Sequence, residues 1–291
     1  MKQSIGPGFS IIDSVLHPTD FSEASRVAFH HALKTALLAR SKLTLLHVSS
    51  GGTSEWSDFP GVRETLERWG LLPKGSEKSA VGELGIKASK VMADETEPVA
   101  AVISYLAKHP ADLIVLVTSQ RDGRVRWLGK SVSEPVTREA GQMTLLIPAD
   151  SEGFVSDRDG SVNLKKILIP IARTPSPQAA VNTAALFVER GKCPEGTFVL
   201  VHVGNSDTMP ACRCPEIPGW TWEKDLRTGP VIEEIVEAAK DHEADLIVMS
   251  TDGRNGFLDG LRGSHSERVL RHGAAPLLTI PIGSRASRHL S

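Results

Sequence analysis

An internal repeat constrains this chain more than any other feature of its sequence. Residues 111–148 and residues 244–281 align without a gap at an offset of 133, and 17 of the 38 aligned positions are identical. Both copies begin with ADLIV and end with Ile-Pro. A match of this density indicates an internal duplication, so the chain is expected to fold into two similar halves.

Each copy of the repeat has the pattern of a strand, a loop, a helix and a second strand. Apolar runs such as 246–249 and 277–280 have the length of strands that are buried on both faces. The residues before each copy continue this alternation. In the first half we expect strands at 15–18, 43–48 and 86–92, and helices at 20–40, 62–69, 77–84 and from 98; in the second half we expect strands at 167–170 and 198–203, and helices from 177 and from 230. The pattern predicts an α/β fold of two tandem domains, each with a parallel sheet that carries helices on both faces.

The segments outside these patterns set the expected boundaries. We expect a first domain over 1–149, a linker over 150–162, a second domain over 163–282 and a disordered tail over 283–291. The linker prediction rests on an acidic segment with glycine and serine and without periodicity. The stretch 204–219 contains Pro210, Pro215 and Pro218, which exclude a regular helix, so we expect an irregular loop there.

Composition excludes several classes of protein. The 33 basic and 35 acidic residues give a formal net charge of −2, whereas general nucleic-acid binders usually carry a net positive charge. No apolar run approaches the length of a membrane span, and the first residues lack a signal-peptide pattern. Three cysteines in a chain of 291 residues do not form a disulfide framework. We therefore expect a reduced cytoplasmic protein without a nucleic-acid or membrane partner.

Several segments resemble the universal stress protein family in its tandem form. They are LTLLHV at 43–48, ADLIV in both copies, and GSHSERVLRHGAAPLLTIP at 263–281. The resemblance implies a five-stranded parallel sheet of the adenine nucleotide alpha hydrolase-like type in each half. It also implies that the halves pair through their last strands as an intramolecular pseudo-dimer, with a homodimer as a further assembly. Many members of the family bind ATP through the glycine motif G-x2-G-x9-G-[S/T].

The second half keeps most of this glycine motif. Its positions hold Ser250, Gly253, Gly263 and Ser264, so only the first glycine is replaced. Glycines allow backbone N–H groups to approach a phosphate closely, and a helix N-terminus with a serine hydroxyl completes an anion site. The alternative is structural: Ser264 forms a capping box with Glu267, and the glycines only permit a turn.

The first half has lost the motif, because the same positions hold Val117, Gln120, Lys130 and Ser131. Side chains at positions 120 and 130 would crowd a phosphate loop. The resemblance therefore places a bound nucleotide in the second half.

Two further positions are implied by the resemblance. Asp20 matches an aspartate that lies near the adenine and ribose, although Asp20 can equally be a helix N-cap with Glu23 completing a capping box. The second half has Ala172 there instead. Val203, like Val48 in the first half, matches an apolar contact to the base, and the alternative is an ordinary buried strand valine.

No catalytic or metal-binding set stands out. The pair Cys212 and Cys214, with Cys193 before the preceding strand, is weak support for a metal or thiol sensor, and we expect no bound metal. His47 and His202 occupy matching strand ends and are interpreted as core or rim histidines. We expect no enzymatic activity beyond slow hydrolysis of bound nucleotide. The main hypothesis is a stress-response regulator that binds ATP in its second domain; the alternative is a nucleotide-free signalling or scaffold protein that acts through protein contacts.

Overall fold

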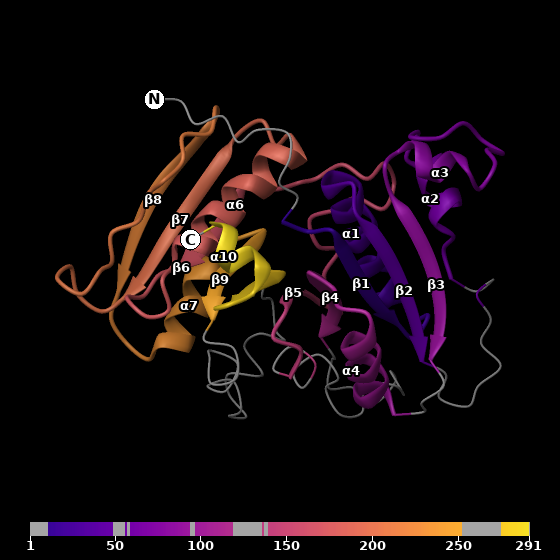
Figure 1. Cartoon of the computed structure of the whole chain (residues 1–291). Helices are drawn as coiled ribbons and strands as arrows, with labels where there is room; N and C mark the ends of the chain where they lie inside the picture. The colour runs from indigo at the N-terminus through magenta and orange to yellow at the C-terminus, as the bar shows by residue number, and fades with distance from the viewer. Residues whose placement is uncertain are drawn as a thin grey trace.

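The computed structural model describes residues 11–48, 56, 59–93, 97–118, 136, 139–251 and 275–290, and these form an α/β molecule built on one ten-stranded sheet (Figure 1). The first half contains β1 Ser14–Thr19, α1 Glu23–Ala39, β2 Lys42–Val48, α2 Val62–Arg68, α3 Ala80–Glu83, β3 Lys87–Ala93, α4 Pro98–Lys108, β4 Leu113–Thr118 and β5 Met143–Pro148. The second half contains β6 Lys166–Pro170, α6 Gln178–Gly191, β7 Gly196–Val203, β8 Trp220–Arg227, α7 Val231–Asp241, β9 Leu246–Thr251, β10 Leu277–Pro281 and α10 Arg285–Leu290.

The strand order confirms two similar halves, each with five parallel strands. The sheet runs β3-β2-β1-β4-β5-β10-β9-β6-β7-β8, so each half has the same order read from its own edge. Within each half every pairing is parallel. The two five-stranded sheets are not separate, because β5 and β10 pair antiparallel and join them into one sheet.

The register of this joint is symmetric. Leu278 lies opposite Leu145, and the offset of 133 that relates the repeat copies maps one of these residues onto the other. The neighbouring pairs, Leu277 with Leu146 and Thr279 with Thr144, also exchange under the same offset. A pseudo-two-fold axis therefore passes through the leucine pair, as in an isologous dimer interface. The predicted pairing of the two last strands is thus present within one chain.

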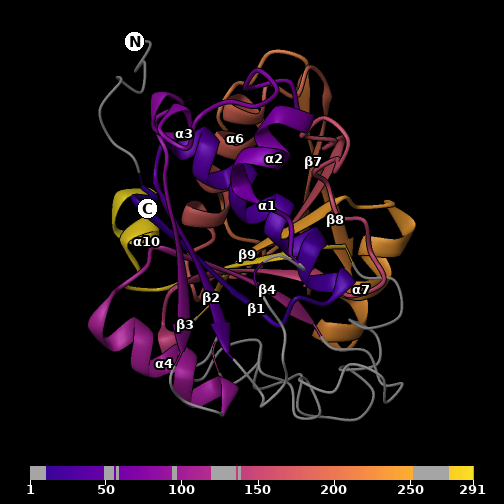
Figure 2. The ribbon, with the colours of Figure 1, turned by 90° about the vertical axis from the view of Figure 1, so that its right-hand side faces the viewer.

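Helices cover both faces of the sheet. Residues of α1, α2 and α6 share one buried apolar cluster, and residues of α4 and α7 belong to the other. Figure 2 shows α1, α2 and α6 on one side of the strands and α4 on the opposite side. The α4 helix begins where the sequence predicts it: Pro98 occupies its first turn, and the Glu97 side chain accepts a hydrogen bond from the Ala100 N–H at 2.7 Å.

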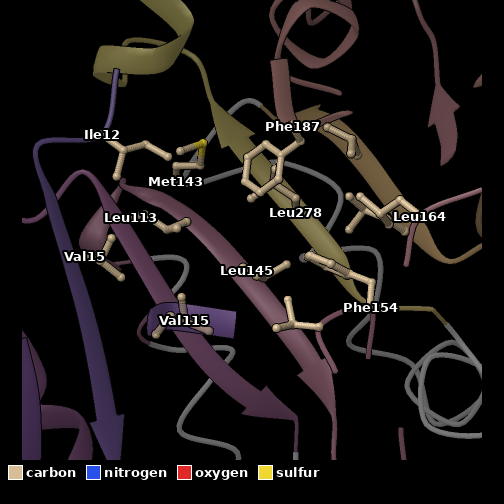
Figure 3. Packing of buried hydrophobic residues seen from close by; sticks show 14 of the residues in the cluster. Ile12, Val15, Leu113, Val115, Met143, Leu145, Phe154, Leu164, Phe187 and Leu278 are labelled. Atoms are coloured by element: carbon tan, nitrogen blue, oxygen red, sulfur yellow. The ribbon is translucent and has the colours of Figure 1, made fainter. Parts of the chain in front are cut away.

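One continuous core spans the junction of the halves. Figure 3 shows Leu145 and Leu278 at its centre, packed among side chains from both halves and from the connecting segment. Leu113 and Val115 lie on the left of this view, and Phe154 and Leu164 lie on the right. Every residue of β5 and β10 is buried. Burial of this apolar surface stabilises the junction together with the strand pairing of β5 and β10.

The connecting segment 150–162 packs against the first half instead of crossing solvent. His31, inside α1 and fully buried, donates from Nδ1 to the Val27 carbonyl at 2.8 Å. Its Nε2 accepts from the N–H groups of Phe154 at 2.9 Å and Val155 at 3.2 Å. The Trp69 indole adds a donation to the Asp157 carbonyl at 3.1 Å. The segment is therefore fastened to α1 and α2.

The predicted disorder of the tail is wrong for residues 285–290, which form α10. The Asn182 amide of α6 donates to the Leu290 carbonyl at 2.7 Å, and Leu290 packs against the main core. Arg285 forms an ion pair with Asp13, beside the start of β1. In Figure 1 this helix lies between the two halves, at the yellow end of the chain.

The second half also differs from the first where the sequence predicts a difference. Residues 204–219 contain no helix and lead into β8, an edge strand that we did not predict separately. The Gln178 side chain holds this loop by two bonds to the Arg213 backbone, at 2.8 and 2.9 Å. The Trp222 indole donates to the Pro215 carbonyl at 3.0 Å. The loop is thus irregular but tied to the domain.

The buried histidines predict that the protein loses stability in mild acid. Burial lowers the pKa of His17 and of His31 from 6.5 to about 4. Between these values the unfolded chain binds more protons than the folded chain, so the free energy of unfolding falls as pH decreases from 6.5 to 4. Each histidine accounts for about 3 kcal/mol of this loss.

Urea unfolding at a series of pH values measures this effect. We expect His31→Gln to reduce the pH dependence. A free energy of unfolding that is constant between pH 7 and pH 4.5 would contradict the assignment.

Candidate functional site

The candidate sites lie where the parallel strands of each half end. Ligands of open α/β sheets bind beyond the carboxyl ends of the strands. In Figure 1 the arrowheads of β2 and β3 on one side and of β7 and β8 on the other point to the same side of the molecule. The two candidate sites therefore face the same side.

In the first half, Asp20 forms a turn rather than the helix cap. Its Oδ1 accepts a hydrogen bond from the Ser22 N–H at 3.0 Å. The N-cap of α1 is Ser22, whose side chain accepts from the Ser25 N–H at 3.2 Å. The alternative interpretation of Asp20 as the N-cap is therefore wrong. The second carboxylate oxygen of Asp20 has no hydrogen-bond partner among the described residues, so it is available to a ligand.

An aromatic stack stands beside Asp20. Phe21 has a left-handed backbone with φ of 64°, which is unusual for a bulky residue. Its ring stacks on that of His47 with centroids 3.8 Å apart and an interplanar angle of 5°. Trp56 contacts the Phe21 ring edge-on, with centroids 4.9 Å apart. The end of β2 in the first half is therefore covered by aromatic rings.

In the second half the corresponding strand end is covered by polar contacts. Ala172 and Arg173, which follow β6, are exposed, and Arg173 Nη2 donates to the Asp207 carbonyl at 2.6 Å. This bond joins the loop after β6 to the loop after β7. His202 Nε2 lies 2.8 Å from the Thr208 hydroxyl in the same loop. No carboxylate replaces Asp20 at this position, since the residue there is Ala172.

His47 and His202 have the same role in the two halves. Both rings are buried, and each Nδ1 donates to the carbonyl of a residue at the end of the neighbouring strand: Thr19 for His47 and Ile171 for His202, both at 3.0 Å. The bonds fix the tautomer with the proton on Nδ1. The interpretation of both as core or rim histidines is confirmed.

Among the four motif positions of the second half, Ser250 is the one that the structure describes. It is the penultimate residue of strand β9 and lies opposite Ile280 of β10. Its hydroxyl is buried and has no hydrogen-bond partner in the described part of the chain. Buried polar atoms are nearly always paired, so an unpaired hydroxyl at a strand end indicates a position where a ligand or water can bind.

The predicted residues divide between two separate sites. β4, β5 and β10 lie between β1 and β9, which places these two strands about 19 Å apart at the usual strand spacing. Asp20 belongs to the site of the first half. Val203 ends β7 on the other side of β6 from Ser250, and it packs partly against the core beside α7. Val203 and Ser250 therefore belong to the second half.

Several predicted residues lie outside the described part of the chain. They are Gly253, Gly263, Ser264 and Glu267 of the second half, and Gln120, Lys130 and Ser131 of the first. The roles predicted for them stay predictions. Val117, which is the first-half counterpart of Ser250, lies in β4.

The thiols show no metal-binding arrangement within the described residues. Cys193 is buried, Cys212 half-buried and Cys214 exposed, and all three are free. Burial raises the pKa of each thiol, which disfavours the thiolate that binds metals. No group of three metal-ligating side chains occurs among the residues that the structure describes.

The sequence was also compared with known protein families. The universal stress protein family matches residues 12–148 and 211–281. The chain belongs to the universal stress protein family. Residues 149–210 lie outside this match, but β6, α6 and β7 in this interval repeat the order of β1, α1 and β2. The structure thus completes the second family domain.

Solved structures support the same fold, the adenine nucleotide alpha hydrolase-like fold. A universal stress protein from Archaeoglobus fulgidus DSM 4304 matches with a TM-score of 0.55 and 17% identity over 93% of this chain and 97% of that chain. A protein of the same family from Pseudomonas aeruginosa UCBPP-PA14 matches with a TM-score of 0.57 and 14% identity over 97% of both chains. The cytoplasmic domain of a prokaryotic cation chloride cotransporter matches with a TM-score of 0.52 and 14% identity, covering 96% of this chain and 100% of that one.

None of the curated proteins matches this universal stress protein. Among its described residues, no helix has the length and apolar character needed to cross a membrane.

The unpaired hydroxyl of Ser250 leads to a stability prediction. Ser250→Ala removes a buried polar atom without removing a hydrogen bond within the described residues, so we expect the free energy of unfolding to rise by about 1 kcal/mol. Ser41→Ala is the matched control, because the Ser41 hydroxyl is also buried and unpaired but lies in the turn between α1 and β2. Both variants can be measured by urea unfolding. Destabilisation of Ser250→Ala by more than 1 kcal/mol would show that its hydroxyl has a partner.

Proposed function

We propose that this universal stress protein is a stress-response regulator that binds ATP or a related adenine nucleotide in its second half, in the cytoplasm. The phosphates bind the loop that contains Gly253, Gly263 and Ser264, and Val203 contacts the base. The protein has no enzymatic activity beyond slow hydrolysis of the bound nucleotide.

One observation carries the proposal: the hydroxyl of Ser250, at the carboxyl end of β9, is buried and has no hydrogen-bond partner among the residues that the structure describes. In this fold a ligand binds beyond the carboxyl ends of the strands, and Ser250 is the first position of the predicted phosphate motif. A phosphate oxygen or an ordered water beside it would satisfy this hydroxyl. The adjacent glycines would let backbone N–H groups approach the same phosphate.

Recognition of the base is expected to be weak. A carboxylate at the position of Ala172 would accept hydrogen bonds from the sugar or base, and alanine cannot. The loss of one charge-assisted hydrogen bond costs about 1.5–3 kcal/mol, or roughly one to two decades in affinity. We therefore expect modest affinity and little discrimination between ATP and GTP.

A nucleotide-free scaffold is the second candidate, and the Arg173–Asp207 bond favours it. This contact of 2.6 Å joins the two loops that would flank a base in the second half. Nucleotide binding must either leave this bond in place or break it. The variant Arg173→Ala tests this contact. If the variant binds ATP more tightly than the parent protein does, the Arg173–Asp207 bond closes the nucleotide site in the free protein.

Gly263→Lys copies the residue of the first half into the second and should abolish ATP binding. The physical reason is steric, because the lysine side chain would occupy the space where backbone N–H groups approach the phosphates. Ser131→Ala, the matched change in the first half, should leave affinity unchanged. Titration calorimetry with ATP and GTP measures both variants.

Mass spectrometry of the natively purified protein provides an independent test, since a retained nucleotide would support the proposal directly. If Gly263→Lys binds ATP as tightly as the parent while Ser131→Ala or Asp20→Ala does not, the nucleotide occupies the first half. If neither the parent nor any variant binds nucleotide, the scaffold function is favoured.

A further inference from the structure

A pocket lies at the amino ends of the strands in the first half, away from the candidate nucleotide sites. Its volume is about 490 Å³, within the range of small-molecule sites. Its floor is the start of β1 and the residues before β4. Lys42 and Thr44 of β2 form one wall, and Tyr105 and Lys108 at the end of α4 form another.

The acidic groups of this pocket are neutralised within the protein. Asp112 Oδ2 accepts from the N–H groups of Asp13 at 2.8 Å and Ser14 at 3.0 Å. Arg285, from α10 of the other half, lies 3.7 Å from the same oxygen and forms an ion pair with Asp13. Both carboxylates therefore have cationic or N–H partners.

The two lysines of the pocket have no acidic partner among the described residues. Lys42 and Lys108 line the pocket, and neither forms an ion pair within the described part of the chain. With Arg285 there are three cationic groups against two carboxylates, so the pocket has a positive charge. Tyr105 supplies an apolar surface beside them, and its ring lies 4.7 Å from that of His109 between centroids.

The duplicated second half shows that the fold does not require these residues. The offset of 133 places Ala238 and Asp241 at the positions of Tyr105 and Lys108. Ser14 at the start of β1 is equivalent to Lys166 at the start of β6, because the next residues, Val15 and Ile167, pair with the equivalent residues Leu113 and Leu246. Ser14 lies opposite Lys42, and Lys166 lies opposite Thr197. The positions of Lys42 and Thr44 are therefore held by Thr197 and Val199 in the second half.

Two side chains at the end of α7 in the second half have partners within the protein. Asp241 accepts from Arg227 at 2.7 Å, and the neighbouring His242 bonds Asp225 at 2.9 Å. Among the described residues, the second half has its lysines at other positions at this end, Lys165 and Lys166 at the start of β6, and it lacks the set of Lys42, Lys108 and Tyr105.

We propose that this pocket binds a small organic anion: a carboxylate or phosphate monoester carried on a planar apolar body. The anionic group binds between Lys42 and Lys108, and the apolar body packs on Tyr105. The Thr44 hydroxyl, which lies 3.3 Å from that of Ser89, provides a further polar contact. Charge-assisted bonds to lysine suit either anion, so the pocket does not choose between them by charge alone.

Ligand-observed NMR titrations of the full chain test the proposal with defined probes: benzoate, phenyl phosphate and, as a neutral control of similar size, benzyl alcohol. We expect at least one anion to bind at millimolar concentration and at least tenfold more tightly than benzyl alcohol. The first two probes distinguish a carboxylate site from a phosphate site.

Variants then locate the binding. Lys42→Thr and Lys108→Asp copy the second half, and each should weaken anion binding at least tenfold; Tyr105→Ala should weaken both anions. Lys74→Asp, the same charge change at an exposed position outside the pocket, should have no effect. Circular dichroism confirms that each variant is folded. The proposal is overturned if neither anion binds, if benzyl alcohol binds as tightly as the anions, or if the Lys42→Thr/Lys108→Asp double variant binds as the parent does.

Discussion

The antiparallel pairing of β5 with β10 is the interaction on which the rest of the structure depends. Each half ends in a strand that is buried on both faces, and alone it would expose this strand as an apolar sheet edge. The symmetric register through Leu145 and Leu278 lets each edge cover the other. The ten-stranded sheet and the shared core follow from this one contact, as do the fastened connecting segment and the position of α10.

Because the joint lies at the last strands, the loops at both ends of the other strands are free to differ between the halves. The first half has Asp20 with an aromatic stack over His47, while the second has an unpaired Ser250 hydroxyl and the Arg173–Asp207 bond. At the amino ends the first half has the cationic pocket, whereas in the second half Asp241, at the position of Lys108, forms an ion pair with Arg227. Duplication has kept the scaffold and allowed each half its own surface chemistry.

The repeat and its alternating apolar runs were sufficient to predict the fold, because strands and helices of a duplicated domain are specified twice. Features that depend on distant contacts could not be predicted in this way. The segment after β5 has no periodicity, yet its N–H groups bond His31, more than a hundred residues away. The tail has few apolar residues and forms a helix because α6 and Asp13 bind it. Asp20 and Ser22 are both residue types that cap helices well. The backbone between them turns at the left-handed Phe21, and Ser22 is the residue that caps α1.

Native-state hydrogen exchange of the amides in β5 and β10 tests the central claim most directly. If the joint holds the two halves as one unit, the core amides of both strands should exchange only through global unfolding, with the same free energy as those of β4 and β9. If the amides of β5 and β10 exchange through a smaller opening while β4 and β9 stay protected, the halves separate before they unfold, and the account is contradicted.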